Sequence, residues 1–180
     1  MHFILGVVAL LAAGLIWYNR IRNAAEVGAE VVDKANDARL AIRRFSYQRK
    51  AGKHPIFTID DARIAGGSLA VAFMEVGDTP TTEQKFRLQT EISKRLHVSV
   101  EEAKEILALG HWFTGQCNDA HTAAVKLAKQ LSKLAGPDVS HDLQAMLYAG
   151  LSDGETMTAA QRTTFNDLSK IFDFSVLEPQ

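Results

Sequence analysis

The chain of 180 residues has only one cysteine and four prolines, and it lacks the common motifs of nucleotide binding and covalent catalysis. A single cysteine excludes a disulfide framework and a cysteine-rich zinc site. There is no GxxxxGK[ST], GxGxxG or GxSxG motif, and the six histidines form no HxxxH or HExxH pair. The sequence therefore contains no motif typical of a P-loop enzyme, a dinucleotide-binding enzyme, a serine hydrolase or a zinc protease of these types.

Charge is also absent from one end of the chain. Residues 1–18 carry no Lys, Arg, Asp or Glu, whereas residues 19–53 carry nine basic against four acidic residues, a net charge of +5. Residues 54–180 carry eleven basic against seventeen acidic residues, a net charge of −6. This division predicts a transmembrane anchor (1–18), a basic helical juxtamembrane stalk (19–53) and a folded body (54–180). The small total charge gives no indication of nucleic-acid binding.

The uncharged segment has the length and ends of a membrane helix. As a helix, Met1–Tyr18 would be about 27 Å long, enough for the hydrocarbon core of a bilayer. Trp17 and Tyr18 would lie at the interface, and Arg20 and Arg22 follow at once. We predict a single-pass anchor in a bacterial inner membrane, with the N-terminus outside and the body cytoplasmic. The alternative is a cleaved signal peptide, although only Met1 and His2 precede the apolar run.

The basic stalk predicts contact with anionic lipids. The alternative is a solvated helix face. Small residues at Gly6, Ala9 and Ala13 share one face of the anchor and could let two copies pair, as could the apolar stripe of the stalk. The residues that we expect at the membrane surface are Trp17, Tyr18, Arg20, Arg22, Arg43, Arg44, Arg49 and Lys50.

The body is predicted to be all-α, a bundle of about six helices, because apolar residues recur at helical spacing and no run alternates like a strand. Inward stripes include Leu88, Ile92 and Leu96 in one helix, Leu107 in the next, and Leu134 near the end of a fourth. Residues at four places can cap helix starts: Thr58 with Asp61, Thr81 with Gln84, Ser99 with Glu102, and Thr158 with Gln161. A further helix is predicted to begin at Asp119.

Two hairpins of the body resemble each other. Residues 92–99 align with residues 168–175 at an offset of 76, and the caps Thr81/Gln84 and Thr158/Gln161 recur at an offset of 77. Each second helix follows a turn that contains Gly and Asp. We infer a pseudo-repeated helical hairpin.

The run Ala149-Gly-Leu-Ser-Asp-Gly154, with Phe172-Asp-Phe-Ser175 after the next helix, resembles the "ADG…E…LGLS" signature of TerB-like domains. The resemblance covers roughly residues 58–177. It implies an all-helical domain with two pseudo-repeated hairpins and a link to tellurite or envelope stress. An anchor and basic stalk before such a domain are similar to the layout of DnaJ-like membrane co-chaperones. No J domain is present, since the nearest match to its His-Pro-Asp tripeptide is His54-Pro55-Ile56.

The resemblance also implies a metal site, because some members of the family bind a divalent metal through acidic residues at the two turns. The weak candidates here are Asp78, Glu83, Asp153 and Glu155, and Gln161 stands where the family has an acid. The metal would be Ca²⁺, Mg²⁺ or Zn²⁺. The alternative is that Asp78 and Asp153-Gly154 simply form turns and caps.

Cys117, His111 and His121 lie around one predicted helix break. The two histidines could meet at a zinc ion, and a Cys117–His121 pair could supply a nucleophile if a third group oriented it. No orienting partner is visible in the sequence, so a half-buried structural thiol is the preferred interpretation. We therefore expect a non-enzymatic membrane-anchored module that binds a protein partner. The alternative is a membrane-tethered thiol or metal-dependent enzyme.

Overall fold

The computed structural model describes residues 46–47, 52–77, 79–136, 139–151, 156–172 and 174, and these contain helices and no strand. A division by contacts places Arg44–Gln180 in one compact unit. The prediction of an all-α body is confirmed. The elements are a short 3₁₀ helix η1 (Pro55–Thr58), then α2 (Ala62–Glu75), α3 (Thr82–Arg95), α4 (Val100–Thr114), α5 (Ala120–Ala135), α6 (Ser140–Ala149) and α7 (Ala159–Ser169).

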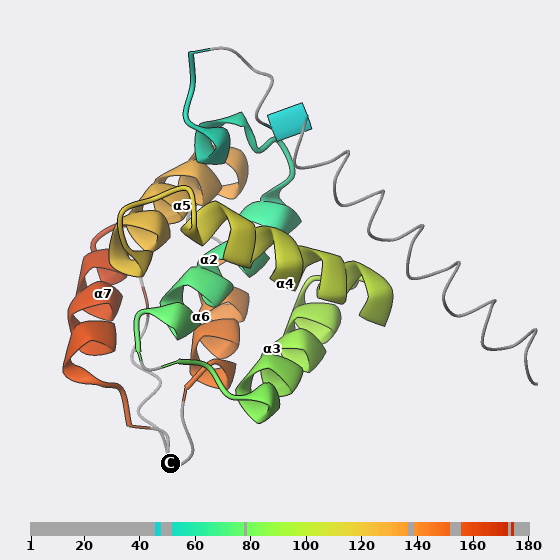
Figure 1. Cartoon of the computed structure of the whole chain (residues 1–180), viewed down its shortest axis with the longest axis vertical. Helices are drawn as coiled ribbons and strands as arrows, with labels where there is room; N and C mark the ends of the chain where they lie inside the picture. The colour runs from blue at the N-terminus through green and yellow to red at the C-terminus, as the bar shows by residue number, and fades with distance from the viewer. Residues whose placement is uncertain are drawn as a thin grey trace, which may run out of the picture. The chain divides into compact units, whose positions relative to one another are not determined.

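Helix α2 lies at the centre of the bundle and contacts the five other α-helices (Figure 1). Every residue from Ile64 to Met74 is buried, so the helix has no solvated face over this stretch. A helix that is apolar or small on all sides is expected in a core. Helices α4 and α5 make its largest contacts, and α6 covers a further side.

The crossing of α2 and α4 depends on two glycines. A methyl group at Gly67 would overlap the side chain of Ile106, and one at Gly110 would lie 2.8 Å from Val71 Cβ. By contrast, a methyl group at Gly66 would be 3.8 Å from Leu131, an ordinary contact. Gly67 and Gly110 therefore let the two helix backbones approach closely.

Three of the four predicted caps are confirmed, and Asp119 caps the helix whose start was predicted there. Ser99 accepts a hydrogen bond from the Glu102 amide, and Asp119 accepts one from the Thr122 amide. Thr81 and Thr158 form complete capping boxes with Gln84 and Gln161. These caps were predictable because a cap and its partner lie within one turn of chain.

The prediction at Thr58 is wrong. Its hydroxyl donates to the carbonyl of Pro55 at 2.7 Å and belongs to η1, while Asp61 caps α2 through the Arg63 amide. Pro55 starts a separate 3₁₀ turn, so the chain leaves η1 before α2 begins. The side chain of Gln130 then bonds the carbonyl of Ile59 and fastens this exit to α5.

Of the inward residues named from the sequence, Leu88 and Ile92 are buried and Leu96 is half-buried. Leu134, in the last turn of α5, is exposed. Leu107 is only half-buried, because it faces a groove beside α3. Ahead of the bundle, Tyr47 is buried with its ring centroid 5.3 Å from that of Phe113.

Candidate functional site

Each of the two interhelical turns contacts a glutamine of the other hairpin. The Nε2 atom of Gln84, in the capping box of α3, donates to the carbonyl of Gly150 after α6 at 3.3 Å. In return, Gln161 of the second capping box packs on Gly77, where a methyl group would lie 2.9 Å from its Nε2 atom. Both glutamines are buried. Each hairpin thus sends a capping residue to the turn of the other.

These glutamine contacts lie beside the two turns where the resemblance implied metal ligands. The Oε1 atoms of both glutamines accept from the backbone amides of Thr81 and Thr158. The guanidinium of Arg87 donates to the carbonyl of Leu151 at 2.8 Å, so a positive charge stands beside the second turn. These groups satisfy carbonyls that the end of α6 leaves free.

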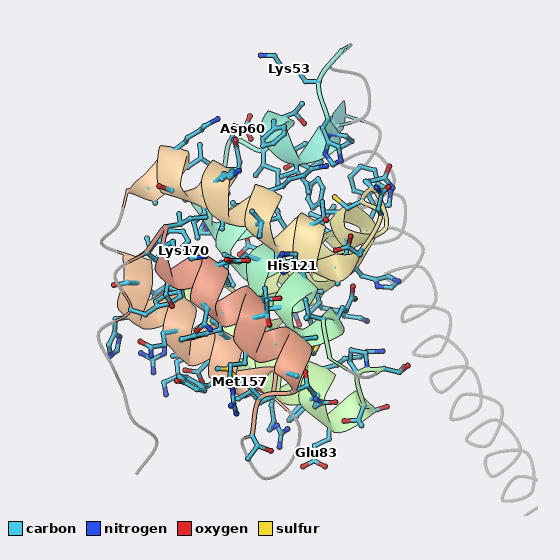
Figure 2. The ribbon with its side chains drawn as sticks, turned by 90° about the vertical axis from the view of Figure 1, so that its left-hand side faces the viewer. Lys53, Asp60, Glu83, His121, Met157 and Lys170 are labelled. Atoms are coloured by element: carbon cyan, nitrogen blue, oxygen red, sulfur yellow. The ribbon has the colours of Figure 1, made fainter. Side chains whose placement is uncertain are left out.

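Of the four candidate metal ligands, Glu83 is described, and it is exposed in the first turn of α3. Figure 2 shows Glu83, in the first turn of α3, and Met157, just before α7, at the same end of the bundle. Asp78, Asp153 and Glu155 lie outside the described residues. Among the described residues, no group of three or more His, Cys, Asp or Glu could hold a metal ion.

The side chain of Cys117 contacts His54 and Lys126, whereas the sequence suggested a pairing with His121. Its Sγ atom is 3.6 Å from His54 Nε2 and 3.9 Å from Lys126 Nζ. The amide of Ile56 donates to His54 Nδ1, so in the neutral ring the proton is on Nε2, which faces the carbonyl of Gln116 at 3.1 Å. His54 in this form is a poor base for the thiol.

Burial raises the pKa of the Cys117 thiol, and the nearby positive charge of Lys126 offsets only part of that effect. A thiol rather than a thiolate therefore predominates at neutral pH, and the thiolate is the nucleophile. The sequence could not identify His54 as the neighbour, because 63 residues separate it from Cys117.

His111 and His121 each bind a different helix. His111 Nδ1 is 2.7 Å from a carboxylate oxygen of Glu75 in α2. His121 Nδ1 is 2.8 Å from the Thr164 hydroxyl in α7, and its Nε2 is 3.6 Å from Asp167. Because the Thr164 hydroxyl donates to the carbonyl of Ala160, it accepts from the His121 ring. Both histidines therefore have partners that join helices.

A surface that the sequence analysis missed lies along α3 and α4, and we call it the α3–α4 face. It contains two hollows, one of about 380 Å³ and one of about 270 Å³. Phe86 and Val100 border the first and are 68% and 58% exposed. The face consists of Lys85, Phe86, Gln89, Thr90, Ser93 and Lys94 of α3 with Val100, Lys104, Leu107, Ala108 and His111 of α4, above Val71, Met74 and Glu75 of α2.

The two hollows are bordered by residues one turn apart on the same two helices. Gln89 follows Lys85 by one turn of α3, and Lys104 follows Val100 by one turn of α4, so neighbouring residues border successive hollows. One signal for this face was present in the sequence. Phe86 lies two residues from Leu88, on the side of its helix opposite the buried stripe, where polar residues are the rule.

The membrane-related predictions concern other parts of the chain. No helix among the described residues is long and apolar enough to cross a membrane. The remaining predicted residues lie outside the described part: Gly6, Ala9, Ala13, Trp17, Tyr18, Arg20, Arg22, Arg43, Arg44, Arg49 and Lys50.

No protein-family model, curated protein or solved structure matches this chain.

Proposed function

We propose that this chain is a membrane-anchored, non-enzymatic helical module that binds a protein partner. The observation that carries the proposal is the α3–α4 face, where Phe86 and Val100 remain mostly exposed beside two hollows. Large exposed apolar side chains gathered at a concave surface are typical of a binding site. A TerB-like identity, and with it a link to envelope or tellurite stress, is part of the proposal and rests on the sequence resemblance alone.

Partner binding is tested in native membranes with the full chain. A photoreactive phenylalanine derivative replaces Phe86, and the same group at Arg162, exposed on α7, serves as the control. We expect a discrete protein adduct from position 86 and none from position 162. A body that gives no protein adduct from either position would contradict the proposal.

Anchoring is supported by the apolar run of residues 1–18 and the basic residues after it. We propose a single pass through the inner membrane with the body in the cytoplasm. Reporter fusions at the C-terminus, one active only outside and one only inside the membrane, test this topology. N-terminal sequencing of the membrane-bound protein distinguishes the anchor from a signal peptide, because cleavage would remove Met1 and the residues after it.

A non-enzymatic role is supported by the engagement of the reactive groups. The thiol pKa of Cys117 is raised, and His54, His111 and His121 each have structural partners. The alternative, a membrane-tethered thiol or metal-dependent enzyme, predicts turnover of ester, phosphodiester or peptide substrates. Turnover that is lost in Cys117→Ala, or that needs added Ca²⁺, Mg²⁺ or Zn²⁺, would favour the alternative.

Metal binding is a separate part of the proposal and has its own test. Calorimetric titration of the full chain with Ca²⁺, Mg²⁺ and Zn²⁺ measures it, with Glu83→Gln as the variant. Hard cations need several oxygen ligands, so a real site should lose affinity when Glu83 is replaced. Absence of heat at millimolar metal would end this part and leave partner binding unaffected.

A further inference from the structure

We propose that the α3–α4 face binds an amphipathic α-helix of the partner protein, with acidic side chains on both sides of its apolar stripe. This inference rests on the proposed function and specifies which surface acts and what chemistry it recognises.

Apolar residues of the face border both hollows. Phe86 and Val100 border the first hollow, and Leu107 borders the second. Residues one turn apart on a helix are about 5–6 Å apart, so successive apolar residues of a bound helix can enter successive hollows. Such binding of a helix in a groove is a recurrent mode of recognition.

The charges of the face favour an acidic partner. Lys85, Lys94 and Lys104 form no ion pair with any described residue. Glu75, which lines the second hollow, is hydrogen-bonded to the His111 ring. Two exposed acids lie near the face, Glu83 one turn before Phe86 and Glu101 beside Val100, and the three lysines outnumber them. Carboxylates flanking an apolar stripe would complement this arrangement.

The same features argue against two other occupants. A bilayer presents a flat boundary, and it would leave the two hollows unfilled. A second copy of this chain, docked face to face by a two-fold axis, would bring lysines against lysines. An acidic amphipathic helix satisfies both the hollows and the charges.

The test selects binders from a displayed library of helices with one face randomised. The bait is the full chain in phosphatidylcholine nanodiscs. We expect the selected helices to carry an apolar i, i+4, i+7 stripe flanked by Asp or Glu. Phe86→Ala and Lys104→Glu should each weaken their binding by at least about tenfold, the size expected for a central contact.

Matched controls are available on other surfaces. Phe57→Ala removes another exposed phenylalanine, and Lys129→Glu reverses an exposed lysine of α5. Both should change the affinity by less than about twofold, as expected away from an interface. Equal effects of Phe57→Ala and Phe86→Ala, or selection of basic helices, would overturn the inference.

Crosslinking from position 86 distinguishes a failure of this inference from a failure of the proposed function. A protein adduct there, together with a library that yields no acidic helix, would overturn the helix chemistry and leave partner binding intact. A lipid adduct from position 86 would assign the face to the membrane and overturn the inference. Absence of adducts from both positions, 86 and 162, would contradict the function itself.

Discussion

The side chain of Gln84 bonds the carbonyl of Gly150, 66 residues further along the chain, with 3.3 Å between Nε2 and the oxygen. The reciprocal contact joins Gln161 to Gly77. Both glutamines also complete capping boxes, so each serves its own helix and the opposite turn. The buried side-chain amides of these glutamines therefore join the two turns at the end of the bundle where the resemblance implies metal ligands.

Gln84→Glu should destabilise the protein. The carboxylate keeps the acceptor of the capping box but loses the amide donor, and it faces the Gly150 carbonyl in a buried place. An unmade buried hydrogen bond costs about 1–3 kcal/mol, so the midpoint of urea unfolding should fall. Gln89→Glu is the matched control, since its bond to the Val100 carbonyl is exposed. A similar loss in both variants would contradict a special role for Gln84.

Gly110→Ala and Gly67→Ala should lower stability, because a methyl group at either position meets the opposite helix at the α2–α4 crossing. Overpacking of this kind costs about 1–3 kcal/mol. Gly66→Ala is the control on the same helix. It should stabilise by about 0.5–1 kcal/mol, since alanine is the better helix former and the space exists. Denaturant titration of the three variants measures the sign of each change.

Ser68→Ala should raise stability. The Ser68 hydroxyl is fully buried and has no hydrogen-bond partner among the described residues. Removing such a group removes its desolvation penalty, about 1–3 kcal/mol, and so raises the free energy of unfolding. Ser93→Ala should instead destabilise, because the Ser93 hydroxyl donates to the Val98 carbonyl at 2.7 Å. Thermal unfolding should therefore shift in opposite directions for the two serines.

Cys117 should react slowly with iodoacetamide at neutral pH. Burial raises the pKa of its thiol, so the rate should reach half its maximum at a higher pH than for an ordinary thiol. Lys126→Met removes the charge that lowers this pKa, and alkylation at a fixed pH should slow further. Lys129→Met leaves the rate unchanged if the effect is local. Faster alkylation than free cysteine at neutral pH would indicate an activated thiol and support the enzymatic alternative.

Much of the local structure follows from short-range patterns. The caps at Thr81, Ser99 and Thr158 were predictable because a side-chain oxygen and the amide it accepts from are three residues apart. The error at Thr58 arose because Pro55 starts a 3₁₀ turn that includes Thr58, so α2 begins later and Asp61 is its cap.

The partial exposure of Leu107 shows what such patterns cannot predict. Helical spacing assigns a residue to one side of a helix, but it does not say which neighbour covers that side. Leu107 lies at the edge of the α4 stripe and faces a hollow instead of a helix. Phe86 could have been noticed, because it stands opposite its own buried stripe, yet its pairing with Val100 needed the packing of α3 on α4.

The sequence by itself determined the all-α class, most helix starts and the division of charge along the chain, since these depend on residues close together. Only the tertiary structure decided that Gln84 and Gln161 exchange turns, that Cys117 meets His54, and that α3 and α4 leave an open face. The reason is physical. These contacts join segments that are distant in the chain, so they depend on how closely helices cross, and glycines such as Gly67 and Gly110 set that distance.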